Sequence, residues 1–205
     1  MKDYQDDPKG EYGLFLLKNP NILDENFFKN IFNYSSDIIF SLEKIYRGEQ
    51  SALVWFAPKK IVEHLGNVSL LELEDYTSNL PLDKIQSWEV NKKKGDKKKE
   101  YEGFHFFKEI SIENDEKVVF QIVFKKENNQ LQTTLRILVS ASTSLRRSII
   151  AKHLDKNISD QSIFVRSDKK FSSKQILGQF KKRSLYPKEV KRQYLLPGEI
   201  IAFLK

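Results

Sequence analysis

Apolar positions in the first third of the chain follow two periods, two residues where strands are expected and three to four where helices are expected. Strands are predicted over residues 13–17, 38–46, 52–56 and 68–73. Helices are predicted after Asp24, a good N-cap, and from Pro58, where proline loses no backbone hydrogen bond. This order matches the ferredoxin-like βαββαβ unit, in which both helices cover one face of a four-stranded sheet.

From residue 84 onward, the pattern predicts strands first and helices afterwards. Strands are expected over residues 86–91, 103–112, 118–125, 131–140 and 163–166. One strand has two apolar faces, and the better core candidates on it are Val118, Phe120, Ile122 and Phe124. These strands are long enough to form a second antiparallel sheet.

Three helices are predicted in this second part. The first is capped by Ser142 or Thr143, the second is capped by Ser172 or Ser173, and the third begins at Pro197. The residues expected to face inward are Leu145, Ile149, Ile150 and Leu154 on the first helix and Ile176, Leu177 and Phe180 on the second. We therefore predict an α+β protein, with a ferredoxin-like βαββαβ first half and a second antiparallel sheet with helices packed beside it.

The same pattern divides the chain into three regions. Residues 1–12 form a polar leader, residues 13–78 a ferredoxin-like subdomain, and residues 84–205 a basic α+β subdomain. Turn-forming residues, including Pro81, separate the two subdomains. The lysine-rich run at residues 92–99 is predicted to be an exposed loop, because like charges repel and extend the chain.

Charge changes sign near this boundary. Residues 1–80 hold 8 basic and 13 acidic residues, a net charge of −5, whereas residues 81–205 hold 27 and 15, a net charge of +12. An anionic partner is one explanation, and a solvated lysine-rich surface is another. The candidate residues for contacting a nucleic acid or another anionic partner are Lys97, Lys98, Lys99, Arg146, Arg147, Lys181, Lys182, Arg183, Lys188, Lys191 and Arg192.

The composition limits the cellular setting. The chain has no cysteine, which excludes disulfides, thiolate metal sites and thiol catalysis. No apolar stretch approaches the roughly 20 residues that span a bilayer, and the first residues are too polar for a signal peptide. We expect a cytoplasmic protein that reaches the inner membrane only peripherally, through its partners.

No pattern indicates an enzyme. None of the eight glycines lies in a phosphate-binding loop, and the three histidines lack metal-ligand spacing. Two pairs, Ser41 with Lys44 and Ser167 with Lys170, match a Ser-x-x-Lys spacing, but the companions of that motif are absent and chance explains them better. We predict no catalytic residue, no cofactor and no metal.

One acidic patch requires a separate interpretation. Glu72, Glu74 and Asp75 offer the oxygen ligands that a divalent cation prefers, and alternation places the two glutamates on one strand face. A solvent-facing strand edge that discourages aggregation is the better explanation.

Three stretches resemble the N-terminal, motor-less region of conjugative type IV secretion ATPases, the hexameric motors of DNA-transfer channels. The first runs from residue 39 to 65 and on to residue 77, through the Glu-Asp-Tyr sequence at residues 74–76 that the family often has at a strand end. The second is residues 135–142, which precede a predicted helix. The third is residues 195–204, similar to the segment before the family's motor.

This resemblance implies a role in docking a motor onto the inner-membrane channel and in contacts between subunits. The family's phosphate-binding motor is not among these residues, so the resemblance implies no ATP hydrolysis. The leading hypothesis is a non-catalytic assembly domain of a DNA-transfer machine, with protein components as partners and with room for an oligomer. The alternative is a nucleic-acid-binding module that uses the basic second half.

Overall fold

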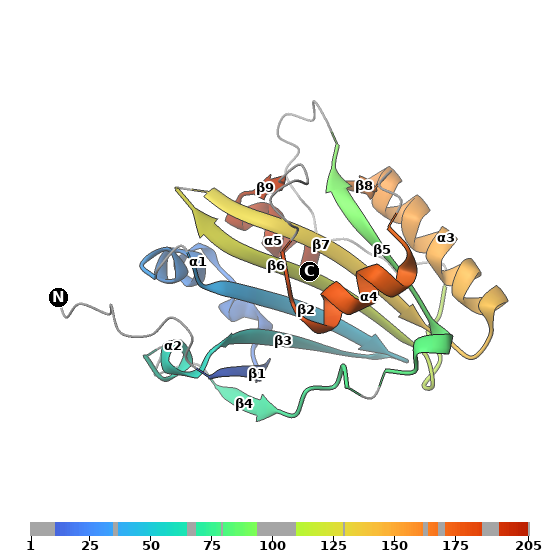
Figure 1. Ribbon diagram of the computed structural model, residues 1–205, viewed down its shortest axis with the longest axis horizontal. Coiled ribbons are helices and arrows are strands. Elements are labelled where there is room, and N and C mark those ends of the chain that lie inside the picture. Colours follow the sequence, from blue (N-terminus) through green and yellow to red (C-terminus); the bar gives the residue numbers. More distant parts are fainter. Residues whose placement is uncertain are drawn as a thin grey trace.

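The computed structural model shows an α+β protein built on one sheet (Figure 1), and it describes residues 11–34, 37–64, 69–78, 80–93, 110–128, 130–161, 164–167, 171–185 and 193–204. Its strands are β1 (Tyr12–Leu17), β2 (Ile39–Arg47), β3 (Gln50–Pro58), β4 (Leu70–Leu73), β5 (Ile85–Lys92), β6 (Lys117–Glu127), β7 (Gln130–Ser140), β8 (Phe164–Arg166) and β9 (Gln193–Leu195). Its α-helices are α1 (Glu25–Phe32), α2 (Lys59–His64), α3 (Ser144–Gln161), α4 (Ser173–Lys181) and α5 (Pro197–Leu204). Two 3₁₀ turns, η1 (Pro20–Ile22) and η2 (Leu82–Lys84), lie between strands.

The strands run in the order β4-β1-β3-β2-β6-β7-β5-β8, and every neighbouring pair is antiparallel. The prediction of two sheets is wrong, because β2 pairs with β6 over eight positions and joins the two halves into one sheet. An isolated ferredoxin-like first half is likewise not confirmed, because β2 lies inside the larger sheet rather than at an edge. The physical reason is that pairing with the long apolar strand β6 buries β2, whereas β2 at a sheet edge would stay exposed to solvent.

Strand β7 holds the second half of the sheet together. Its first residues, Leu131–Thr133, pair with β9, and its later residues, from Leu135 to Ser140, pair with β5. Strand β9 is absent from the sequence-based prediction, which places no element at residues 193–195. The predicted strand over residues 103–112 lies mostly outside the described residues, and residues 110–112 are not part of a strand.

Helices α1, α2, α3 and α5 supply apolar side chains to one large core. We call the side of the sheet that faces this core the helix-rich face. The face predicted for β6 is confirmed here, since Val118, Phe120, Ile122 and Phe124 are all fully buried. Aromatic rings pack closely within it, with Phe28 against Phe124 and Phe120 against Phe203 of α5.

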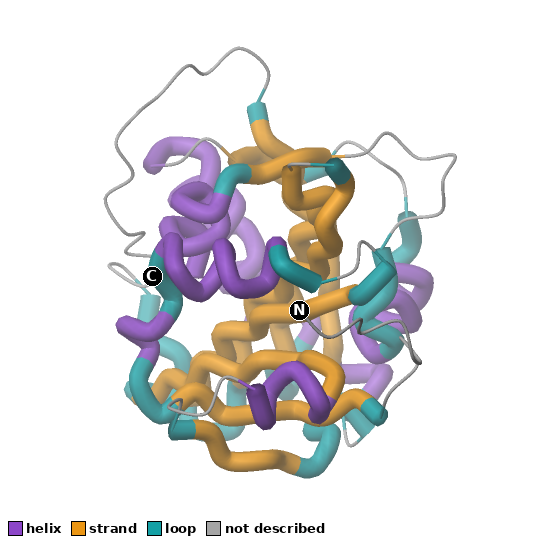
Figure 2. Tube along the Cα trace, turned by 90° about the vertical axis from the view of Figure 1, so that its left-hand side faces the viewer, coloured by secondary structure: helices purple, strands orange, loops and turns teal. Residues whose placement is uncertain are grey.

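The opposite side of the sheet, which we call the α4 face, is covered by a single helix in its central part. Leu177 and Phe180 of α4 pack on Val119 and Leu138. Ile85, the first residue of β5 after η2, belongs to the same apolar cluster. Figure 1 shows α4 crossing the central strands, and Figure 2 shows helices on both sides of the sheet.

Local signals predict the helix ends well. The N-cap Asp24 accepts from the Phe27 amide at 2.8 Å, and Ser172 forms a capping box with Gln175. Thr143 is the residue whose hydroxyl accepts from the third amide of α3.

The predicted inward face of α3 needs a correction. Leu145 and Ile149 are 71% and 47% exposed, whereas Ile150 and Leu154 are buried as predicted. The buried stripe continues through Ala151 and Ile158, so the helix is rotated relative to the prediction.

Candidate functional site

Among the candidate basic residues that the structure describes, the arginines are engaged by groups of the protein itself. Arg183 is 3% exposed, and its guanidinium pairs with Glu43 at 2.9 Å and Asp75 at 2.8 Å. It also lies over the Phe56 ring, 4.8 Å from the centroid. In this structure Arg183 therefore holds the end of α4 to the sheet and does not face an external phosphate.

Arg183 pairs with one end of a row of polar residues that crosses the sheet, which we call the polar ladder. The members of this row are in register on β2, β6, β7 and β5, and they are Glu43, Gln121, Arg136 and Glu89. All four are buried beneath α4 and the residues that follow it.

Glu43 is the most heavily bonded member of the ladder. One carboxylate oxygen accepts from Ser41, Gln121 and Arg183 at 2.9–3.0 Å, and the other accepts from the Tyr76 hydroxyl at 2.6 Å. Its lone pairs are thus engaged by fixed donors, as a buried carboxylate requires. These bonds tie β2 to β6, to Tyr76 and to the residues that follow α4, which is a structural role.

The surroundings shift the pKa values of three other side chains in this network. Burial lowers the pKa of Arg136 to about 10, although Glu89 partly opposes the shift. For Arg183, burial works in the same direction, but Glu43 and Asp75 outweigh it and leave the pKa of its guanidinium raised. Burial, reinforced by the Glu43 carboxylate, raises the pKa of Tyr76 well above its usual value, so its hydroxyl keeps its proton.

The remaining candidate cations are scattered. Arg146 forms a bidentate pair with Glu116 at 2.6 and 2.9 Å, and Arg147 donates to the Ala141 carbonyl at 2.7 Å. Lys181 is half-buried at the end of α4, and Lys182 is exposed just after it. The candidates that lie outside the described residues are Lys97, Lys98, Lys99, Lys188, Lys191 and Arg192.

The acidic residues of the predicted patch form ion pairs with different partners. Glu72 pairs with Lys59 at 2.8 Å, whereas Asp75 pairs with Arg183. Across the described residues, no group of three or more histidine or acidic side chains is placed to hold a metal ion. Ser41 and Lys44 point to opposite faces of β2, since Ser41 bonds Glu43 and Lys44 lines a groove on the other side.

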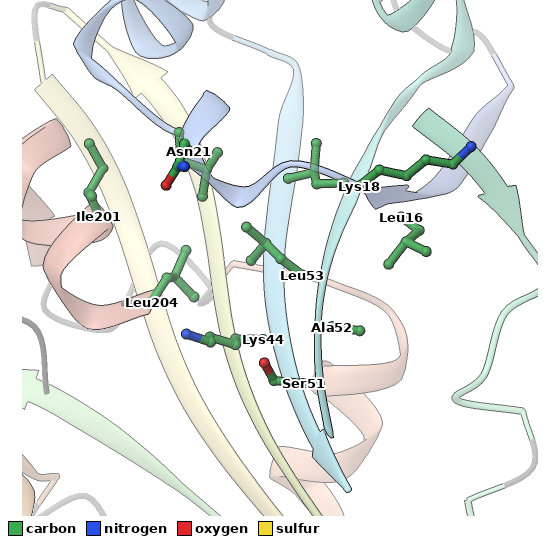
Figure 3. Close-up of a pocket in the computed structure, with 11 residues that line it drawn as sticks. Leu16, Lys18, Asn21, Lys44, Ser51, Ala52, Leu53, Ile201 and Leu204 are labelled. Carbon is green, nitrogen blue, oxygen red and sulfur yellow. The ribbon is translucent and has the colours of Figure 1, made fainter. Parts of the chain in front are cut away.

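That groove is the concave feature of interest on the helix-rich face (Figure 3). It encloses about 700 Å³ between the β1–η1 segment, strands β2 and β3, and helix α5. Its lining residues are Leu16, Leu17, Lys18, Asn21, Leu23, Lys44, Ser51, Ala52, Leu53, Ile201 and Leu204. Seven of them are apolar, and three at the rim (Lys18, Asn21 and Ser51) are exposed to solvent.

Local structure fixes both walls of the groove. On one wall, the Asn19 side chain accepts from the Asn21 amide at 3.0 Å and turns the chain away from β1. On the other wall, Phe203 anchors α5 by edge-to-face contacts with Phe120 and Phe164. Ile201 and Leu204 of the same helix then face the groove (Figure 3). The sequence did not reveal this site, because its lining comes from segments far apart in the chain.

Comparison with known proteins adds no family assignment. No protein-family model matches the chain, and no curated protein matches it. One further structural finding bears on its setting: none of the helices in the described part of the chain has the length and apolar character needed to cross a membrane.

Proposed function

We propose that the chain is a non-catalytic docking domain that joins protein components of a DNA-transfer machine of the type IV secretion or conjugation kind. The observation that carries the docking role is the apolar groove with a solvent-exposed rim. A concave apolar surface of this size is typical of sites that receive a ligand or a partner segment. The sequence resemblance to the motor-less region of conjugative ATPases supports the particular machine.

The distribution of polar groups favours binding over catalysis. On the α4 face, the buried Glu43 and Arg183 engage each other, and Arg136 donates to Gln121. The buried carboxylates elsewhere, Glu116 and Glu199, are paired with Arg146 and Lys92. The groove lies on the helix-rich face, and the eleven described residues that line it include no carboxylate and no histidine. Carboxylates and imidazoles are frequent general bases and metal ligands, so their absence from these residues favours a binding role.

The arrangement of the first half also supports this proposal. We propose that β1 to β4 with α1 and α2 are a ferredoxin-like unit extended by β6, and what supports this is the local strand order β4-β1-β3-β2. We propose a cytoplasmic location, with peripheral attachment to the inner membrane through the docked partner.

Site-specific photo-crosslinking in the cell of origin tests this proposal. A benzophenone amino acid replaces Ser51 at the groove rim, and the matched control replaces Lys182, an exposed residue beyond α4. We expect position 51 to capture a protein of the DNA-transfer machine and position 182 to capture none. Capture of unrelated proteins only, or equal capture from both positions, would contradict the proposal.

Nucleic-acid binding is the second candidate, and the net charge of +12 in residues 81–205 favours it. Fluorescence anisotropy with a labelled single-stranded oligonucleotide distinguishes the two functions. Salt-sensitive binding that weakens in a Lys181→Gln/Lys182→Gln double variant would support this alternative. Absence of binding at low salt would remove it.

A further inference from the structure

Lys44 occupies an unusual place in the groove. It follows Phe40 and Leu42 on the same face of β2, and its cross-strand neighbours are Leu53 and Phe120. Its ammonium lies 5.4 Å from the centroid of the Tyr46 ring. A lysine ordinarily extends its charge into bulk water, whereas Lys44 is half-buried among apolar side chains.

Among the described residues that line the groove, the charged ones are all positive. These eleven residues include two lysines and no acidic residue. Figure 3 shows that the Lys18 amine extends away from the groove, while the Lys44 amine points toward Leu204 of α5. Lys44 therefore determines the electrostatic character of the interior, and an anionic group complements it.

The strands beneath the groove have no free edge to offer. Strand β1 pairs with β3 and β4, β2 pairs with β3 and β6, and β3 pairs with β1 and β2. An extended peptide consequently cannot add to the sheet here by backbone hydrogen bonds. Ile201 and Leu204, one turn apart on α5, instead give the groove a helical wall, and side chains of another helix can pack against such a wall.

We propose that the groove receives an amphipathic helix of a partner protein, whose apolar side chains fill it and whose Asp or Glu side chain pairs with Lys44. This inference rests on the docking function proposed above and adds the chemistry of the partner. An ion pair inside a partly desolvated groove is screened less than one at the open surface, so it adds selectivity for an acidic helix.

The protonation of Lys44 makes the same binding pH-dependent. Burial lowers the pKa of its ammonium, and a bound carboxylate would raise it again. Affinity is therefore greatest where Lys44 is charged in the free protein, and it falls as pH rises through the pKa of Lys44.

The test uses a phage-displayed library of helical peptides panned on the full chain. Selected peptides are synthesised and measured by calorimetry on the wild type, Lys44→Met, Lys18→Met and Ser51→Trp. Met matches the length of the lysine stem, and tryptophan at exposed Ser51 narrows the groove while suiting a strand. Thermal melts establish that each variant is folded.

We expect enriched peptides to carry an acidic residue within their apolar stripe. Their affinity should fall about tenfold on Lys44→Met, stay unchanged on Lys18→Met, and be lost on Ser51→Trp. Peptides that are sensitive to Ser51→Trp but bind Lys44→Met equally well would overturn this inference and leave the docking function standing. If no peptide is enriched, or if none responds to Ser51→Trp, both proposals fail.

Discussion

The two faces of the sheet bury their strands in different ways. The helix-rich face is covered by four helices whose aromatic and aliphatic side chains form one core. The α4 face is covered centrally by a single helix over a small apolar cluster and a row of buried charges. The first face leaves an apolar groove at its margin, whereas the second engages its polar groups internally.

This difference separates the mutually engaged charges of the polar ladder from a half-buried lysine that lines a groove. On the α4 face, each charge brought into the interior lies next to an opposite charge or a fixed hydrogen-bond partner. On the helix-rich face, the half-buried Lys44 stands beside space that a partner can enter. The first arrangement stabilises the fold, and the second suits recognition.

The largest expected effect comes from breaking the pair between Arg183 and Glu43. Arg183→Met removes the cation and leaves the buried Glu43 carboxylate with fewer donors, so we expect the free energy of unfolding to fall by about 3–5 kcal/mol. Arg183 also has a φ of +47°, a conformation that a non-glycine residue keeps only when its contacts enforce it. Urea denaturation measures the change.

The neighbouring Lys182→Met is the matched control, because Lys182 is exposed and is expected to change stability by less than about 0.5 kcal/mol. If both variants prove equally stable, Arg183 does not hold α4 to the sheet.

A smaller loss is expected from Tyr76→Phe. This variant keeps the ring but removes the hydroxyl that donates to Glu43 at 2.6 Å. Hydrogen bonds to charged groups contribute about 1.5–3 kcal/mol, so a loss in that range is expected in thermal or urea unfolding. A stability equal to the wild type would mean that water or another donor replaces the hydroxyl.

The pH dependence of stability reports on the exposed end of the same network. Burial alone would raise the pKa of Asp75, but hydrogen bonds from Arg183 and Thr77 outweigh it and hold that pKa below its usual range. Because the folded-state value is the lower one, the contribution is present above the unfolded pKa and is lost as pH falls through the folded one.

Asp75 is about half-exposed, with a side-chain exposure of 48%, so we expect an effect below about 1 kcal/mol. Unfolding experiments from neutral to acidic pH should show a flatter profile for Asp75→Asn than for the wild type. Identical profiles would contradict the assignment.

On the helix-rich face, the expected effect of removing a charge has the opposite sign. Lys44→Met should leave stability unchanged or raise it by up to about 1 kcal/mol, because burial disfavours the ammonium that it removes. Lys18→Met, at the exposed rim, is the control. A marked loss of stability in Lys44→Met would place this lysine among the structural charges.

Local periodicity predicts much of the fold. The apolar face of β6, the N-caps Asp24 and Ser172, and the hairpin of β2 and β3 are all confirmed. Each depends on residues close in sequence, where side-chain period and capping chemistry act directly.

The features that escaped prediction are non-local. Glu43, Gln121 and Arg136 are polar residues within strands, and no local pattern predicts their burial. Contacts with α4 and the residues after it bury them, such as the one between Glu43 and Arg183, 140 positions apart. The joining of both halves into one sheet depends on pairing between β2 and β6, which no local pattern encodes. The groove is likewise assembled from β1, β2, β3 and α5.

The most direct test of the account is to map which face a bound partner helix touches. Methyl-labelled protein is titrated with a peptide selected on the wild type, and its methyl resonances are followed by NMR. We predict shifts at Leu53, Ile201 and Leu204 in the groove and none at Leu138 of β7 or at Leu177 of α4, which packs on it. Shifts at Leu138 and Leu177 without any change in the groove would contradict the account.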